Sequence, residues 1–100
     1  MKVRLNKEYT KSLFEALLTL ETTDEYAALF EDLCTINEIH AMGQRLEVAK
    51  LLSIELPYNE IAEITGASTA TISRVAKCLN YGTGGYEMVL KRLKDREEQA

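Results

Sequence analysis

Apolar residues recur three and four positions apart through most of this 100-residue chain, and this spacing constrains its fold more than any other feature. The repeat places apolar side chains on one stripe of an α-helix, whereas a half-buried strand would alternate apolar and polar residues. The periodic segments are short, and residues that start or end helices separate them. The sequence therefore predicts an all-α fold of about six helices in a single domain over residues 1–100.

The first half of the chain is expected to hold three helices. The first runs over about 7–19. Thr22 with Glu25, and Thr35 with Glu38, form the capping-box pattern, in which the threonine and glutamate side chains accept amide N–H bonds of a first helical turn. These boxes predict the starts of a second and a longer third helix. The inner face of the third helix is expected to carry Ile39, Met42, Leu46, Ala49 and either Leu52 or Ile54.

Residues 58–77 have the spacing of a helix-turn-helix. Pro57 fits the start of a helix over about 58–65, where its missing N–H costs nothing. Gly66 suits the left-handed residue of a sharp turn, and Ser68 can cap the next helix, over 69–80. The side chains expected to face inward are Ile61, Ile64, Ala67, Ile72, Val75, Ala76 and Leu79.

The opposite face of the helix over 69–80 carries small and polar side chains at its leading end. It presents Ala70, Ser73, Arg74 and Lys77, with Thr69 and Thr71 on its flanks. Short side chains let a helix backbone enter the major groove of DNA, where hydroxyl and methyl groups meet base edges. Arginine and lysine can reach phosphates or a guanine. An ordinary helical hairpin with a glycine turn, or a helix-turn-helix without DNA binding, remains the alternative interpretation.

A turn over 82–85 and a C-terminal helix over 86–97 complete the predicted order, with Met88, Val89, Leu90 and Leu93 as its apolar residues. The short helices together carry more apolar surface than one small core needs. Two interlocked chains would bury that surface, so we expect a homodimer.

Charge is distributed unevenly along this acidic protein, whose net charge is −4. Residues 12–65 contain two basic and eleven acidic side chains, whereas residues 66–94 contain five basic and one acidic. The predicted reading helix therefore lies in a locally basic segment, as a polyanionic partner requires. The basic residues Lys2, Arg4, Lys7 and Lys11 form an N-terminal arm that could add to it.

Several other function classes find no support. His40 is the lone histidine, and Glu38, two residues earlier, cannot share its helical face, so an enzyme is not predicted. Cys34 and Cys78 lack the spacing of a metal site or a disulfide framework. No apolar run is long enough to span a membrane, and the N-terminus lacks a signal-peptide pattern, so we expect a cytoplasmic protein without a membrane partner.

Two stretches resemble the Trp repressor family, including its shorter YerC/YecD-type members. They are TINEIHAMGQR at 35–45 and GASTATISR at 66–74. The resemblance implies an intertwined homodimer in which residues 1–55 supply dimerisation helices and the helix-turn-helix over 57–80 meets double-stranded DNA. The DNA-binding residues expected from the resemblance and the helical pattern are Asn59, Gly66, Ser68, Thr69, Ala70, Thr71, Ser73, Arg74 and Lys77.

The family also binds an amino-acid corepressor, and four residues match its pocket. Arg45 and Arg74 match the arginines that sandwich the indole, and Thr35 and Thr71 match two further pocket residues. Three departures concern the same pocket. Val75 stands where the family has glycine, Cys78 replaces a serine, and the spacing between the arginines is one residue shorter, near 55–58.

A branched valine would crowd a flat indole, so L-tryptophan is disfavoured as an effector and no cofactor is predicted with certainty. Without an effector, Arg45 would form an ion pair on the surface or at the dimer interface. Arg74 would then contact a phosphate.

These observations predict a transcriptional repressor or related regulator that reads the major groove with the helix over 69–80. A protein-interaction module that keeps the helix-turn-helix only as a scaffold is the second hypothesis, because the basic face is sparse and phosphate contacts supply much of the affinity for DNA.

Overall fold

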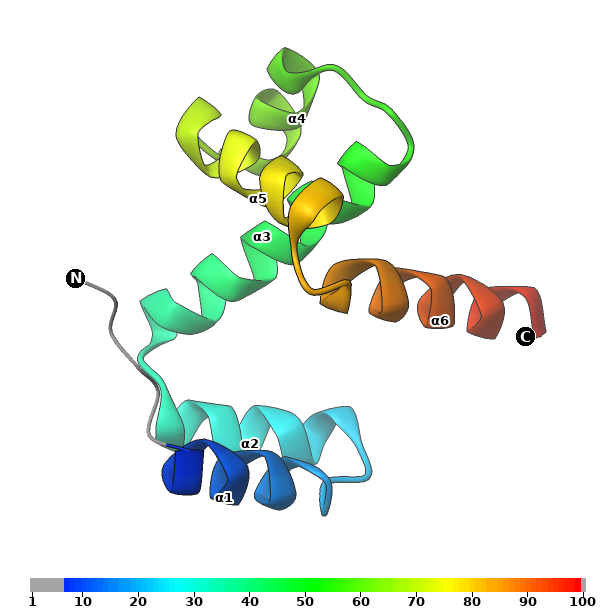
Figure 1. Cartoon of the computed structure of the whole chain (residues 1–100). Coiled ribbons are helices and arrows are strands. Elements are labelled where there is room, and N and C mark those ends of the chain that lie inside the picture. Colours follow the sequence, from blue (N-terminus) through cyan, green and yellow to red (C-terminus); the bar gives the residue numbers. More distant parts are fainter. Residues whose placement is uncertain (1–6, 100) are drawn as a thin grey trace. The chain divides into compact units, whose positions relative to one another are not determined.

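The computed structural model describes residues 7–99 and confirms the all-α class (Figure 1). The described residues form six helices and no strand. The helices are α1 (Lys7–Leu17), α2 (Thr23–Leu33), α3 (Ile36–Ser53), α4 (Tyr58–Thr65), α5 (Thr69–Tyr81) and α6 (Gly85–Gln99). The chain divides into two compact units with the boundary between Ile39 and His40, inside α3. Lys2 and Arg4 of the predicted basic arm lie outside the described residues.

Both predicted capping boxes start helices, with one difference between them. In the second box the Thr35 N–H donates to Glu38 Oε1 (2.8 Å) and the Glu38 N–H donates to Thr35 Oγ1 (3.1 Å), which is the complete reciprocal pair. In the first, the Glu25 N–H donates to Thr22 Oγ1, but the Glu25 carboxylate accepts from the N–H of Glu21 (2.7 Å). Each box therefore satisfies amide groups that the start of a helix leaves without a partner.

Three predicted helix ends were wrong. α5 continues to Tyr81 and not to 80. α1 ends at Leu17 and not at Thr19, because the Thr19 N–H donates to the carbonyl only three residues back, at Ala16, in a tighter turn. α6 continues to Gln99 and not to 97, so the charged tail belongs to the helix.

The end of α3 uses a left-handed residue that is not glycine. Glu55 has φ 63°. Its N–H donates to the Leu52 carbonyl (3.0 Å), and the Leu56 N–H donates to the Leu51 carbonyl (3.2 Å). This pair of bonds is the Schellman motif. Leu51 and Leu56 both pack against the core, as is usual for the residues that flank this motif.

Among the described residues, the buried core lies entirely in the second unit. It consists of Val48, Ala49, Ile61, Ala67, Ile72 and Val75. α3, α4, the turn and α5 each contribute to it, and residues of α6 pack at its edge. The core thus fixes α5 by its inner side, as the predicted stripe requires.

Two predicted inner positions were wrong. Ile64 is 62% exposed although it lies only three residues after the fully buried Ile61, so the core covers just part of that face of α4. Met42 is also exposed. Of the two alternatives at the end of α3, Leu52 packs against the core, whereas Ile54 lies outside the helix and is exposed. The buried residues of α3 are Ala49, which was predicted, and Val48, which was not.

The first unit is packed differently, since α1 and α2 contain no buried residue. Tyr26 on α2 reaches α1, where its hydroxyl donates to the Leu17 carbonyl (3.4 Å). Large apolar side chains of both helices remain exposed, among them Phe14, Leu18 and Leu33. The described residues of this unit therefore form no closed core within one chain.

Candidate nucleic-acid interface

The turn between α4 and α5 has the predicted geometry. Gly66 adopts φ 73°, a left-handed conformation that a side chain disfavours, and its N–H donates to the Ala62 carbonyl (2.8 Å). Ala67 follows with only 5% of its surface exposed. The small residues that follow α4 therefore close a tight turn and bring α5 directly onto the core.

Hydrogen bonds that the sequence pattern did not predict hold this turn. The Thr65 hydroxyl donates to the Ile61 carbonyl (2.7 Å) and accepts the N–H of Ala67 (3.1 Å). The side-chain amide of Gln44 on α3 donates to the Thr65 carbonyl (3.1 Å). The usable signal was indirect, because the last carbonyls of any helix need donors. Nothing in the sequence identified Gln44 as the donor.

Two hydroxyl groups at the start of α5 are used by the helix itself. Ser68 caps α5, since its Oγ accepts the N–H of Thr71 (3.1 Å). The Ser68 hydroxyl also donates to Thr71 Oγ1 (3.1 Å). The hydroxyls of Thr69 and Ser73 form no hydrogen bond with another described residue. Of the four hydroxyls, Thr69 and Ser73 are thus the ones available to a ligand.

The structure brings the predicted DNA-binding residues to the solvent side of α4, the turn and α5. Thr71 is half-buried, and the exposed residues are Asn59, Gly66, Ser68, Thr69, Ala70, Ser73, Arg74 and Lys77. On the other side of α5, Ile72 is fully buried and Val75 is 2% exposed. One helix therefore separates a packed face from a polar face.

The charged groups of this face are free to meet a partner. Between described residues, ion pairs join Lys11 to Glu15 and Lys50 to Glu47. Arg74 and Lys77 take part in neither. The first turn of α5 contains no acidic residue, so no carboxylate there neutralises the partial positive charge at the start of the helix. An anion such as a phosphate is favoured at such a helix start.

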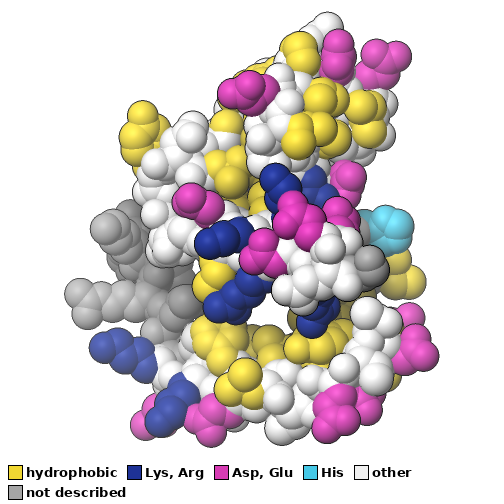
Figure 2. Space-filling model, turned by 90° about the vertical axis from the view of Figure 1, so that its right-hand side faces the viewer, with side chains coloured by type: hydrophobic (Ala, Val, Ile, Leu, Met, Phe, Trp, Pro, Cys, Tyr) yellow, Lys and Arg dark blue, Asp and Glu magenta, His cyan; other side chains and the backbone are white. Residues whose placement is uncertain are grey.

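α4 has the opposite character. It carries Glu60 and Glu63 and no basic residue. Figure 2 shows acidic side chains beside hydrophobic ones at the top of the view, where Figure 1 places α4 and the preceding loop. Ile54, Tyr58 and Ile64 are the large exposed apolar residues of this segment. The basic character of the predicted interface therefore comes from α5 alone.

The predicted effector residues are distributed over both units. Arg45, Thr71 and Arg74 belong to the second unit, and Thr35 belongs to the first. Arg45 is exposed and forms no ion pair with a described residue. Thr35 already accepts the N–H of Glu38, and the hydrogen bonds from Thr35 hold the pKa of the Glu38 carboxyl below its ordinary value. Val75 fills the core beside Ile72.

Other kinds of site find no residues in the described part of the chain. Within residues 7–99 no group of three or more His, Cys, Asp or Glu side chains is placed to hold a metal ion. Both cysteines are free thiols, Cys34 half-buried and Cys78 exposed. None of the described helices is long and apolar enough to cross a membrane.

The fold and the solvent face of α5 define a helix-turn-helix protein. The model of the Trp repressor protein family matches residues 8–94, and the chain belongs to this family. The family consists of DNA-binding regulators and not of enzymes, so membership supports a DNA-binding, regulatory class of function.

Three similar proteins are bacterial. The uncharacterized protein YerC of Bacillus subtilis (strain 168) is 48% identical over 97 residues, which cover 97% of this chain and 93% of YerC. A TrpR-like protein from Eubacterium eligens ATCC 27750 has a solved structure with a TM-score of 0.85 and 54% identity, covering 87% of this chain and 90% of that one. The crystal structure of a candidate Trp repressor from Staphylococcus aureus has a TM-score of 0.84 and 46% sequence identity, and the match covers 87% of each chain.

Proposed function

We propose that this protein is a cytoplasmic, homodimeric transcriptional regulator that binds double-stranded DNA in a sequence-specific manner. The observation that carries the proposal is the division of α5 into a buried face, Ile72 and Val75, and an exposed face of short polar side chains. Such a helix can approach the floor of a major groove closely while the core holds its inner side.

The exposed residues would make two kinds of contact with DNA, to base edges and to phosphates. Thr69 and Ser73, whose hydroxyls form no hydrogen bond with a described residue, would meet base edges directly or through water. Arg74 and Lys77 would contact phosphates, and Asn59 on α4 would add a contact at the margin. Ser68 and Thr71 would act through the start of α5, because their hydroxyls already bond to the helix.

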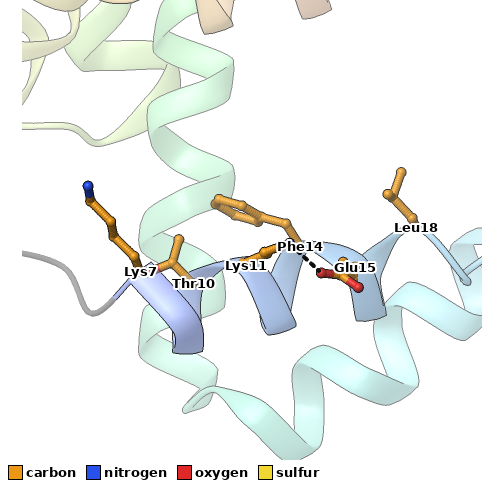
Figure 3. A pocket seen from close by; sticks show the side chains of 6 residues that line it. All are labelled: Lys7, Thr10, Lys11, Phe14, Glu15 and Leu18. Carbon is orange, nitrogen blue, oxygen red and sulfur yellow. Dashed lines mark ion pairs between the residues drawn. The ribbon is translucent and has the colours of Figure 1, made fainter.

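A second copy of the chain is proposed to cover the first unit. α1 presents an open groove of about 410 Å³ lined by Lys7, Thr10, Lys11, Phe14, Glu15 and Leu18. Figure 3 shows Phe14 and Leu18 projecting from the same side of α1. Phe14 is 57% and Leu18 is 84% exposed. Exposure of so much apolar surface to water is unfavourable, so pairing of two chains would complete a single domain. A stable monomer in sedimentation at micromolar concentration would contradict this proposal.

Binding is proposed to need no tryptophan. Val75 packs in the core, so its side chain fixes α5 from within the protein. Arg45 would then remain a surface residue and Arg74 would contact a phosphate, and neither would bind an indole ring. DNA affinity is therefore expected to be the same with and without added L-tryptophan, and an increase on its addition would restore the effector pocket.

Selection of bound genomic fragments by the purified protein at physiological salt tests the main proposal. Enrichment of a palindromic site is expected. Arg74→Ala should then weaken binding and reduce the slope of log affinity against log salt by about one unit for each phosphate that the arginine no longer neutralises, or about two units in a dimer. Lys50→Ala is the matched control, because Lys50 pairs with Glu47 on α3. An unchanged slope for Arg74→Ala would show that this residue does not bind a phosphate.

A protein-interaction module remains the second candidate function. The observation that favours it is the exposed apolar surface of Ile54, Tyr58 and Ile64 next to the acidic residues of α4. No enriched fragment, combined with a protein partner whose binding is abolished in Ile64→Asp, would support this candidate.

A further inference from the structure

Gln44 forms the one hydrogen bond between described residues that joins α3 to the helix-turn-helix. Its side-chain nitrogen donates to the Thr65 carbonyl (3.1 Å), twenty-one positions along the chain. Thr65 is the last residue of α4, and Gln44 lies two turns before the end of α3. We infer that Gln44 and Thr65 are positioning residues of the DNA-reading helix, an inference that rests on the proposed function.

Thr65 continues this connection into the turn. Its hydroxyl donates to the Ile61 carbonyl inside α4 (2.7 Å) and accepts the N–H of Ala67 (3.1 Å). Because Ala67 is only 5% exposed, its N–H depends largely on this acceptor inside the protein. Loss of the Thr65 hydroxyl would leave a donor in the turn without an acceptor, which costs more than an exposed hydrogen bond.

Ser68 connects the turn to the first turn of α5. It follows Ala67 directly, and its side chain accepts the N–H of Thr71 in the first turn of α5. Gln44, Thr65, Ala67, Ser68 and Thr71 therefore form a continuous series from α3 to the start of the reading helix. The core residues hold α5 laterally, whereas this series sets the angle and register of its leading end.

This arrangement matters for reading because specificity depends on sub-ångström placement. A binding group needs to be held near its productive geometry by residues that do not themselves touch the ligand. Phosphate contacts made by long side chains tolerate small shifts, but the short hydroxyls of Thr69 and Ser73 do not. Loosening the series should therefore lower specific affinity while leaving non-specific affinity and its salt dependence unchanged.

Matched variants of the full chain test the inference. Thr65→Val removes the hydroxyl at constant shape, and Thr65→Ser retains it. Gln44→Met removes the donor at similar length. Thr65→Val and Gln44→Met are each expected to lower affinity for the selected site about five-fold, with affinity for a scrambled duplex and the salt slope unchanged. Thr65→Ser should retain the ratio of the two affinities. Val48→Ala is the control for a general loss of stability, and it should keep that ratio as well.

Hydrogen exchange separates failure of this inference from failure of the proposed function. The Ala67 amide should exchange at least about ten-fold faster in Thr65→Val than in Thr65→Ser, while amides of Ile72 and Val75 stay protected. Equal Ala67 exchange in these variants, or an unchanged specificity ratio in Thr65→Val and Gln44→Met, overturns the inference. Fast exchange in a protein that selects no DNA sequence overturns the reading role together with the proposed function, and leaves only a turn-stabilising role.

Discussion

Replacing Glu55 by glycine should stabilise the protein. Glu55 holds a left-handed conformation, φ 63°, at the end of α3. Its side chain is exposed and forms neither an ion pair nor a side-chain hydrogen bond with a described residue. A residue other than glycine pays roughly 1–2 kcal/mol for this conformation. Glycine avoids that cost but loses about 0.5–1 kcal/mol more chain entropy on folding. The difference predicts a gain of about 0.5–1 kcal/mol for Glu55→Gly.

Urea unfolding at fixed protein concentration measures the gain, because the stability of a dimer depends on concentration. The melting temperature should rise by about 2–8 °C. Glu55→Ala is the control that removes the charge but keeps a Cβ atom, and Glu55→Asn introduces a residue that tolerates the left-handed region. The expected order of stability is Gly, then Asn, then Ala.

Two results would refute this reasoning. If Glu55→Gly and Glu55→Ala were equally stable, the gain would come from removing a negative charge at the end of a helix and not from the backbone. If Glu55→Gly were less stable than the wild type, the left-handed conformation of Glu55 would cost less than the chain entropy that glycine loses on folding.

Three further predictions concern the core and the caps. In chemical denaturation, Ile72→Ala should lower the free energy of unfolding by about 2–5 kcal/mol, because Ile72 is fully buried. Ile64→Ala, at a 62% exposed position, should change it by less than about 0.5 kcal/mol. Equal losses would contradict the described core. Ser68→Ala should lower the free energy of unfolding by about 1 kcal/mol in calorimetry, because it removes the cap of α5. Thr69→Ala should leave stability unchanged and alter the DNA fragments that the protein selects. A Ser68→Ala variant as stable as the wild type would contradict the cap. The hydrogen bonds from Thr35 lower the folded-state pKa of the Glu38 carboxyl below 4.5. This capping box therefore stabilises the protein above pH 4.5, and its contribution is lost as the pH falls through the folded-state pKa. An ordinary pKa for Glu38 in an NMR titration would contradict this prediction.

Much of the architecture was predictable because its signals are local. The two threonine-glutamate pairs, Gly66 and Ser68 each act within a few residues of their own position, so the sequence was sufficient to place helix starts and the turn. The stripe of Ile72 and Val75 was predictable for the same reason, since a helix of known start fixes which residues share a face. The exposed face of α5, and with it the candidate interface, followed from that stripe.

Other features depended on contacts that sequence patterns do not encode. Ile64 is apolar and shares a helical face with the buried Ile61, yet it is exposed, whereas Val48 on α3, which the pattern did not predict, is fully buried. Glu55 adopts a conformation for which glycine is the usual signal. These positions were decided by which surfaces the other helices cover.

By itself, the sequence determined the helices, the turn and the polar face of α5, because periodicity and capping are properties of neighbouring residues. Only the tertiary structure decided that Gln44 donates to Thr65, and that Thr69 and Ser73, rather than Ser68 and Thr71, keep hydroxyls free of hydrogen bonds to other described residues. The physical reason is that a hydrogen bond between distant residues requires a particular distance and direction, and packing of the whole unit sets both.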